Sequence, residues 1–361
     1  MDQIPAAMDR HLDVVQCHRD GGLLLGASSL TGRYWLGSLW FYQNPALAPD
    51  VERCTAGVQL EAGLRDAKWA AADKVLVGLD TGGVAIWQLT DDFRTFVLSC
   101  SAIEHDDIVS CVTVTADGTK AISSGYDGMI KLWDLSKLSS LNSCRVHYDI
   151  IWSVECHPTE TDLFLSCSQD GQVLLWDCRN PRPASIVEIP QLEGSPTCVS
   201  WQPGTQHVAA VSSDLGQVIV NDIRMNKETA TVFSPHSRFV YKTEFCPGKP
   251  NLLASVGEDC RTVVTDLQND SVCQVYSEVC HSDFVHGLTW FGSDSLYTCG
   301  WDSQIKLHSL NGVPASDRVK QEPVVMAVNG DLTKEQCDMV TDSKPNYSQV
   351  VQGCQEVTSQ R

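Results

Sequence analysis

The sequence predicts an all-β fold, a seven-bladed β-propeller, and three observations lead to that prediction. Seven segments of similar pattern follow one another along the 361-residue chain. Their corresponding positions are spaced by 43 to 46 residues. Each segment alternates short apolar runs with turn residues, as antiparallel strands do. Four-stranded units at this period close radially into a ring, so each segment is expected to form one blade.

The third and fourth segments show the pattern most completely. Residues 105–135 read HDDIVSCVTVTADGTKAISSGYDGMIKLWDL, and residues 147–177 read HYDIIWSVECHPTETDLFLSCSQDGQVLLWD. A His opens each segment, an apolar run and a turn follow, a second run ends in Ser-x-x-x-Asp, and a third run ends in Trp-Asp. This order predicts a three-stranded antiparallel meander, with room for a fourth strand before the next segment.

The other five segments repeat the pattern less completely. The first reads HLDVVQCHRDGGLLLGASS and runs into SLWFYQ, and the others span residues 61–89, 195–223, 236–267 and 281–310. The position of the third-strand Trp is occupied, in order, by Phe41, Trp87, Trp133, Trp176, Asn221, Thr265 and His308.

Over residues 11–310 the chain resembles the WD-repeat family, because the period, the turn residues and the Trp-Asp endings agree. In that family a His, a Ser or Thr, an Asp and a Trp form a hydrogen-bonded chain that ties each blade's turn to its third strand. The resemblance assigns the full set to His105, Ser123, Asp127 and Trp133, and again to His147, Ser166, Asp170 and Trp176. The sets His236, Ser255, Asp259 and His281, Thr298, Asp302 lack the Trp.

A Ser, a His and an Asp also occur together in hydrolase triads. Recurrence in several segments favours a structural role, because such a network satisfies buried polar groups. The chain has no Walker loop, no GxSxG, no metal-spaced His pair and no dinucleotide fingerprint. We therefore expect no enzymatic activity, no cofactor and no metal. The first, second and fifth segments lack parts of the set, so we expect apolar packing to hold their blades.

The two ends differ from the repeats. Residues 1–10 are predicted to form a short N-terminal arm, residues 11–310 the propeller, and the polar residues 311–361 a disordered tail. The last outer strand of such a ring is usually borrowed from the other terminus. The candidates are residues 2–8, which family habit favours, and PVVMAV at 323–328. VKQE at 319–322 fits the short consensus for attachment of a ubiquitin-like protein.

Composition restricts the partners and the compartment. The formal charge of −19 argues against direct nucleic-acid binding and favours basic partners, although it also serves solubility. The sequence shows neither a leader nor an apolar run of about 18 residues, so we expect neither secretion nor membrane insertion. The 16 cysteines are dispersed, without a CxxC, and the Cys-His pairs at 17–18, 156–157 and 280–281 lack chelating spacing. We expect reduced thiols and a location in cytoplasm and nucleus.

The first segment contains an unusual turn. Ser28 is nine residues from the turn glycine Gly37, whereas Ser123 is five residues from Gly128. The extra residues include Arg33, Tyr34 and Trp35, so a longer hairpin tip is expected to project from the blade. Trp, Tyr and Arg dominate the binding energy of interfaces. We predict that these three residues bind a partner. The alternative is that Trp35 packs back on the neighbouring blade.

Further partner contacts are expected just after each segment's His, where the WD-repeat family presents residues on one face. The candidates are Asp106, Asp107, Tyr148, Arg238, Phe239, Asp283 and Phe284. Ordinary loop solvation is the alternative for each of them. For Phe239 and Phe284 the alternative is packing at the start of a strand.

Within the WD-repeat family, the stretch LLLGASSLTGRYWLGSLWFYQNP resembles the methylosome subunits. The resemblance implies a non-catalytic adaptor bound to a protein arginine methyltransferase of the symmetric-dimethylating kind (type II), in a hetero-octamer with four copies of each chain. It implies basic substrates, namely Sm proteins and histone tails, and a methyl donor bound by the partner. Another face of the propeller is expected to recruit the substrate.

A second reading of the sequence is a substrate receptor. WDCR at 176–179, and more loosely NDIR at 221–224, match the WDxR pattern by which some propellers dock on the adaptor of a cullin-RING ubiquitin ligase. The pattern is short and common in WD repeats, so it stands here as an alternative.

Overall fold

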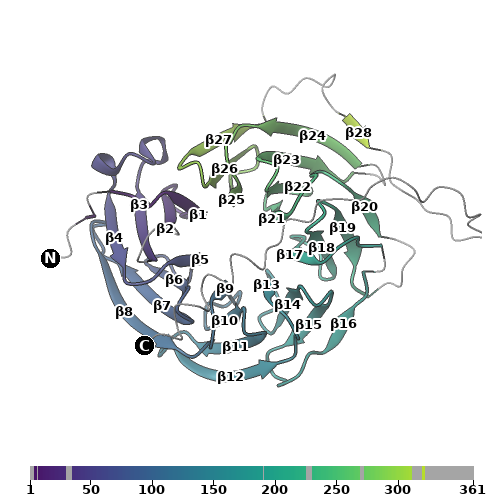
Figure 1. Ribbon diagram of the computed structural model, residues 1–361, viewed down its shortest axis with the longest axis horizontal. Coiled ribbons are helices and arrows are strands. Elements are labelled where there is room, and N and C mark those ends of the chain that lie inside the picture. The colour runs from purple at the N-terminus through teal and green to yellow at the C-terminus, as the bar shows by residue number, and fades with distance from the viewer. Residues whose placement is uncertain are drawn as a thin grey trace, which may run out of the picture. The chain divides into compact units, whose positions relative to one another are not determined.

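The computed structural model describes residues 4–5, 7–29, 35–189, 191–224, 230–268 and 272–310, together with the backbone of 319–321. Most of the predicted arm, the predicted tail and the candidates Arg33 and Tyr34 lie outside these residues. The described residues form seven antiparallel sheets arranged radially around an axis (Figure 1). The prediction of an all-β, seven-bladed WD-repeat propeller is therefore confirmed.

Consecutive strands form each blade. The first three blades contain β1 (His11–Cys17), β2 (Leu23–Ser29), β3 (Leu36–Tyr42) and β4 (Ala56–Leu60); β5 (Leu64–Trp69), β6 (Lys74–Leu79), β7 (Gly83–Leu89) and β8 (Phe96–Ile103); and β9 (Val109–Val114), β10 (Lys120–Gly125), β11 (Met129–Asp134) and β12 (Ser139–Arg145). Two short 3₁₀ turns, η1 (Pro45–Leu47) and η2 (Val51–Arg53), precede β4.

The fourth and fifth blades contain β13 (Ile151–Cys156), β14 (Leu163–Ser168), β15 (Val173–Asp177) and β16 (Ser185–Val187); and β17 (Pro196–Trp201), β18 (Val208–Ser213), β19 (Val218–Asp222) and β20 (Thr231–Phe233). The last two contain β21 (Val240–Cys246), β22 (Lys249–Gly257), β23 (Arg261–Asp266) and β24 (Val272–Val279); and β25 (Val285–Phe291), β26 (Ser295–Gly300) and β27 (Ile305–Ser309).

The hydrophobic core lies between neighbouring blades. Ile122 and Leu132 of blade three, for example, share one buried cluster with Ile151, Val154 and Phe164 of blade four. The inner strands are buried on both faces, as in β2, where six of seven residues are buried, because neighbouring blades cover both sides of each sheet. Burying one such large aliphatic side chain contributes about 1.5 to 3 kcal/mol, so this packing between sheets is the main favourable term that holds the ring together.

The ring closes between blade seven and blade one through side chains. Trp301 Nε1 donates to Asp13 Oδ1 at 2.9 Å, and Ser303 Oγ donates to the Arg10 carbonyl at 2.7 Å. Tyr297 and Cys299 of β26 belong to the same buried cluster as Leu12 of β1. We call these contacts the closing seam.

Neither terminus supplies a fourth strand to blade seven within the described residues. Residues 4–5 and 7–8 of the first candidate are not in a strand, and residues 323–328 lie outside the described part. The short strand β28 (Val319–Gln321) instead pairs antiparallel with β24, as a fifth strand of blade six.

Two further expectations can be compared with the described residues. The 14 cysteines within them are all free thiols. No helix in this part of the chain is long and apolar enough to cross a bilayer.

Candidate partner-binding surfaces

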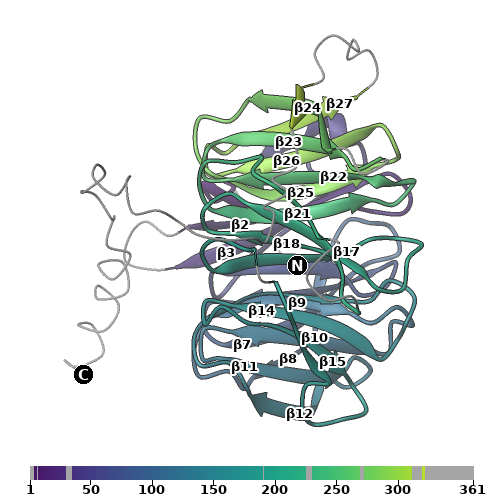
Figure 2. The same ribbon diagram turned by 90° about the vertical axis from the view of Figure 1, so that its right-hand side faces the viewer.

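One face of the ring carries the loops that begin each blade. In blades two to seven the loop before the first strand and the turn between the second and third strands lie at the same end, and two of these turns accept a hydrogen bond from the loop that opens the next blade. Gly82 O accepts from His105 N at 3.2 Å, and Gly216 O accepts from His236 N at 3.3 Å. Figure 2 views the ring from the side, with the loops at its two faces. We call the face with these loops the His-loop face.

The four-residue network predicted for blade three has its members within hydrogen-bond distance. Trp133 Nε1 donates to Ser123 Oγ at 2.8 Å, and His105 Nε2 lies 2.7 Å from the same hydroxyl. His105 Nδ1 lies 3.0 Å from Asp127 Oδ2. Burial raises the pKa of Asp127, but the hydrogen bond and the charge of His105 outweigh burial and hold this pKa below its ordinary value.

Blade four has the same geometry. Trp176 Nε1 donates to Ser166 Oγ at 2.9 Å, His147 Nε2 lies 2.9 Å from that hydroxyl, and His147 Nδ1 lies 2.9 Å from Asp170 Oδ2. The Ser hydroxyl in both blades is buried and shared between a Trp and a His. A hydroxyl in this position holds the sheet together and is not presented to a substrate.

The network also positions the loop that follows each His. The Asp carboxylate accepts from the next backbone N–H: Asp127 from Asp106 at 3.1 Å, and Asp170 from Tyr148 at 3.1 Å. Ser237 and Ser282 donate in the same way to Asp259 and Asp302. The buried network therefore fixes the backbone at the candidate contact residues.

Those candidates differ in how accessible they are. Tyr148 is 87% exposed, and Asp106, Asp107 and Arg238 are exposed as well. Asp283 is half-buried.

Phe239 and Phe284 are half-buried and pack against other rings. Phe239 lies 5.3 Å from Trp152 and 4.8 Å from Tyr241, measured between ring centroids. Phe284 lies 5.7 Å from Trp301. Phe239 and Phe284 therefore pack at the start of a strand, which is the alternative that the sequence analysis gave for these two residues.

These rings belong to an aromatic belt that the sequence analysis missed. It includes rings of blades three, four, six, seven and one. Neighbouring centroids lie 3.7 to 5.6 Å apart in the series Tyr126, Trp152, Phe239, Tyr241, His286, Trp301 and His11, and Phe284 lies 5.7 Å from Trp301. Trp152, Tyr241 and His286 are each the second residue of their blade's first strand. Aligning the repeats in columns would have shown this signal.

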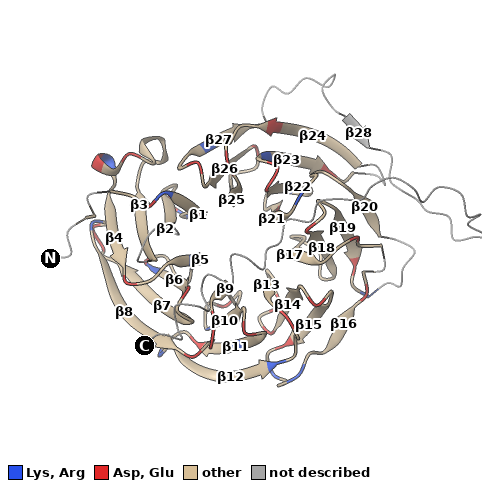
Figure 3. Cartoon of the chain, in the orientation of Figure 1, with Lys and Arg blue, Asp and Glu red and all other residues tan. Residues whose placement is uncertain are grey.

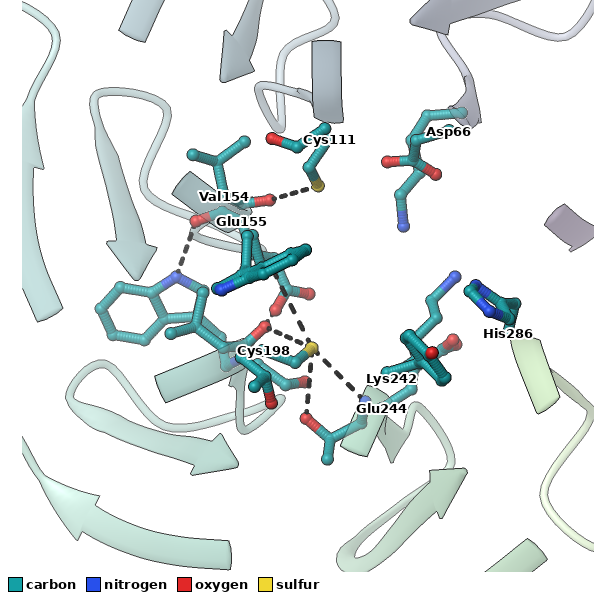
Figure 4. A pocket seen from close by; sticks show the side chains of 18 of the residues that line it. Asp66, Cys111, Val154, Glu155, Cys198, Lys242, Glu244 and His286 are labelled. Carbon is teal, nitrogen blue, oxygen red and sulfur yellow. Dashed lines mark hydrogen bonds between the residues drawn. The ribbon is translucent and has the colours of Figure 1, made fainter. Parts of the chain in front are cut away.

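A cavity of about 320 Å³ lies inside the ring, lined by residues from the first strands of all seven blades. Its charged side chains include Asp66, Lys68, Glu155, Lys242 and Glu244. In Figure 4 the side chains of Asp66, Glu155 and Lys242 extend into the space between the strands.

The cavity shifts the pKa of its charged groups. Burial raises the pKa of Glu155 to about 7, although Lys68 opposes the shift. Burial also raises the pKa of the Cys111 and Cys198 thiols, so these cysteines are not activated as nucleophiles.

Trp35 lies immediately before β3, at the end of the strands that forms the His-loop face. The pairing of β2 with β3 ends at Ser29 and Leu36. Trp35 and Leu36 are both 37% exposed. Trp35 is therefore neither enclosed in the core nor fully free.

Charged residues lie at both faces. At the His-loop face, the turns between the second and third strands of blades two to seven each carry acids and no Lys or Arg: Asp80, Asp127, Asp170, Asp214, Asp259 and Asp302 lie in them. The opposite face has exposed cations, among them Arg94, Arg179 and Arg182, and exposed acids, among them Asp91, Asp92 and Glu160. Figure 3 shows acids around the ring at these turns. The exposed acids Glu61, Asp106, Asp107, Asp149 and Glu193, in the loops before the first strands, lie at the same end of the strands as Trp35.

Comparison with known proteins agrees with this architecture. The family described as WD domain, G-beta repeat matches residues 93–134 and 138–177. The methylosome protein WDR77 of Xenopus laevis is 37% identical over 308 residues, which cover 85% of this chain and 91% of that protein. This chain belongs to the family of methylosome WD-repeat proteins.

The first-segment turn resembles the corresponding stretch of methylosome protein 50, and this resemblance is thus confirmed. Two other relatives are more distant from this methylosome WD-repeat protein. Protein valois of Drosophila melanogaster is 24% identical over 82% of this chain and 85% of its own length. The E3 ubiquitin-protein ligase COP1 of Arabidopsis thaliana is 30% identical over 53% of this chain and 29% of its own length.

Proposed function

We propose that this chain is a non-catalytic adaptor that binds a type II protein arginine methyltransferase, in a hetero-octamer of four copies of each chain. It presents basic substrates, such as Sm proteins and histone tails, for symmetric dimethylation. The partner binds the methyl donor, and the complex works in cytoplasm and nucleus. Membership of the methylosome WD-repeat family is the observation that carries this proposal.

The Trp35 hairpin is the proposed attachment point. A Trp that is 37% exposed immediately before β3 is suited to fill a pocket on a partner. Truncating such an aromatic anchor costs at least about 2 kcal/mol of binding free energy, and exposed acids at a rim usually contribute less than about 1 kcal/mol. Trp35 should therefore set the affinity for the enzyme.

The exposed acids of the His-loop face, Glu61, Asp106, Asp107, Asp149 and Glu193, are the proposed substrate-attracting surface. Their charge is suited to raise the local concentration of Arg-rich tails, and this attraction should weaken with salt. Because the same face carries Trp35, a bound enzyme and a basic tail would lie next to each other. Presentation of the tail then requires no movement of the propeller.

The test is co-purification of Trp35→Ala with the methyltransferase. Affinity should fall by at least about 30-fold, which corresponds to the loss of one aromatic anchor. The circular-dichroism spectrum and the melting temperature should be unchanged. Phe291→Ala, which removes an aromatic side chain that is 39% exposed at the opposite face, at the end of β25, is the matched control. Full retention of the complex by Trp35→Ala would refute the proposed attachment.

A docking site for a ubiquitin-ligase adaptor is the second candidate, because of one specific observation. Arg179 forms two hydrogen bonds with Asp177, at 2.8 and 2.6 Å, and Arg224 forms two with Asp222, at 3.1 and 2.7 Å. Both Arg side chains are exposed, on neighbouring blades of the opposite face. Arg179→Ala should abolish adaptor pull-down if this function holds, and should leave methyltransferase binding unaltered.

A further inference from the structure

Blade seven departs from the network of blades three and four at one position. Where those blades have Trp133 and Trp176, β27 has His308, and His308 Nε2 lies 2.8 Å from the Thr298 hydroxyl. His281 Nε2 lies 2.8 Å from the same hydroxyl. Two imidazole nitrogens therefore converge on one buried point.

A thiol joins them. Cys280 Sγ lies 3.8 Å from His308 Nε2, and the three donor atoms of Cys280, His281 and His308 all lie within 4.8 Å of one another. Both His residues are 3% exposed, and Cys280 is half-buried. The adjacent pair Cys280-His281 cannot chelate by its spacing alone, but the fold adds a third donor from another strand.

We propose that Cys280, His281 and His308 form a binding site for a zinc ion. A tetrahedral zinc ion with Zn–N of about 2.0 to 2.1 Å and Zn–S of about 2.3 Å places its ligands about 3.3 to 3.7 Å apart. The observed separations reach that range with a contraction of about 1 Å. Cys280 binds as the thiolate and releases its proton to solvent, and a water or the Thr298 hydroxyl completes the coordination.

The outer nitrogen of each imidazole is already anchored, as zinc ligands require. His281 Nδ1 lies 3.0 Å from Asp302 Oδ1, and His308 Nδ1 lies 2.7 Å from Tyr276 Oη. Tyr276 Oη in turn contacts Glu278 Oε2. Each ring is thus held with its Nε2 directed toward the shared point.

An inventory of hydrogens gives a second reason. The polar chain runs from Glu278 through Tyr276, His308, Thr298 and His281 to Asp302, which makes five contacts. With neutral imidazoles, the two hydroxyls and the two rings bring one hydrogen each. Four hydrogens therefore serve five contacts, and one contact is left without a hydrogen. In blades three and four the Trp N–H supplies the hydrogen that is short here.

A zinc ion removes this shortage. It takes the lone pairs of both Nε2 atoms, so each imidazole keeps its hydrogen on Nδ1. His281 then donates to Asp302, His308 donates to the Tyr276 oxygen, and Tyr276 donates to Glu278. Each remaining contact has one hydrogen, and no buried nitrogen faces another acceptor.

The experiment is titration of the full-length reduced chain with zinc chloride against a chromophoric chelator, followed by cobalt chloride as a spectroscopic probe. We expect one ion per chain held at this site, and a Co²⁺ spectrum with tetrahedral d–d bands and a thiolate charge-transfer band. Cys280→Ser should remove the charge-transfer band and weaken the site by about 100-fold. Cys178→Ser, which alters another half-buried free thiol, should change neither.

His308→Trp keeps the test independent of folding. It restores the residue type of the other two blades, so the chain should fold and should bind no ion at this site. The proposal is wrong if the wild-type chain binds no zinc in the micromolar range. It is equally wrong if Cys280→Ser and His308→Trp bind the ion as tightly as the wild type.

Discussion

Trp301 donates its indole N–H to the carboxylate of Asp13 at 2.9 Å, although 288 residues separate them in the chain. Asp13 also accepts from the Ser28 hydroxyl, and its residue is only 7% exposed. This contact lies in the closing seam, so its loss should weaken the ring where its first and last blades meet.

We expect Trp301→Phe to lower the free energy of unfolding by about 2 kcal/mol more than Trp69→Phe does. The reason is that the former leaves a buried carboxyl oxygen of Asp13 without this hydrogen-bond partner. Trp69 is the matched control, because its Nε1 is buried and has no hydrogen-bond partner in the described part of the chain. Urea denaturation of both variants measures the difference. Equal losses would show that the seam depends on packing alone.

Asp127→Asn should lower stability by about 1.5 to 3 kcal/mol at pH 7, because hydrogen bonds to a charged partner are weakened. The folded-state pKa of Asp127 lies below its ordinary 3.8. Its ionised form therefore stabilises the fold above pH 3.8, and this contribution is lost as the pH falls through the folded-state pKa. The difference between wild type and variant should thus shrink in acid.

Unfolding free energies between pH 2.5 and 7 test that expectation. Asp106→Asn, an exposed acid in the neighbouring loop, should behave like the wild type throughout. A difference for Asp127→Asn that stays constant with pH would contradict the assignment of the charge.

Glu155 should show the opposite pH dependence. Its pKa is about 7 in the folded state against 4.5 ordinarily, because burial disfavours the charge. The folded state then holds the proton more tightly than the unfolded state, so stability falls as the pH rises from 4.5 to 7, by roughly 3 kcal/mol in total. Glu155→Gln should flatten the curve over this window and be more stable than the wild type at pH 8. Glu61→Gln, at an exposed loop position, should leave the slope unchanged.

Phe239→Ala should destabilise the chain by about 2 kcal/mol or more, because Phe239 packs between Trp152 and Tyr241. Tyr148→Ala should change the unfolding free energy by less than about 0.5 kcal/mol, since that side chain is 87% exposed. Thermal melts distinguish the two. If Phe239→Ala left the unfolding free energy unchanged, Phe239 would again be a candidate for contact with a partner.

Residue spacing was enough to predict the parts of this molecule that repeat. His105, Ser123, Asp127 and Trp133 could be placed together because one unit with the same internal distances recurs along the chain. The family resemblance then supplied the geometry that relates them.

Features made by several blades together were not predictable in this way. The polar residues Lys68, Glu155 and Glu244 each occupy the fifth position of a first strand. In an isolated sheet, a polar residue at such a position is expected to face solvent. In a ring it faces the axis, where side chains from other blades share one cavity, and this geometry exists only after closure.

Blade one illustrates a second reason. Its third strand was aligned on Phe41, but the structure uses the neighbouring residue: Trp40 Nε1 donates to Ser38 Oγ at 2.9 Å, and Ser38 Oγ donates to Asp9 Oδ2 at 2.7 Å. The polar contact is supplied by residues outside the repeat pattern, so no comparison of the segments could find it.

The described strands of each blade from β1 to β27 are consecutive in the chain, which has a consequence for synthesis on the ribosome. Each sheet can complete its ladder as it emerges, before the next one has been translated. The flank of β1, with Leu12 and Val15, must wait until residues 297–301 have been made before it is covered. For most of translation, the nascent chain is therefore an incomplete ring with one exposed apolar surface on β1. A chaperone would be most useful at that surface.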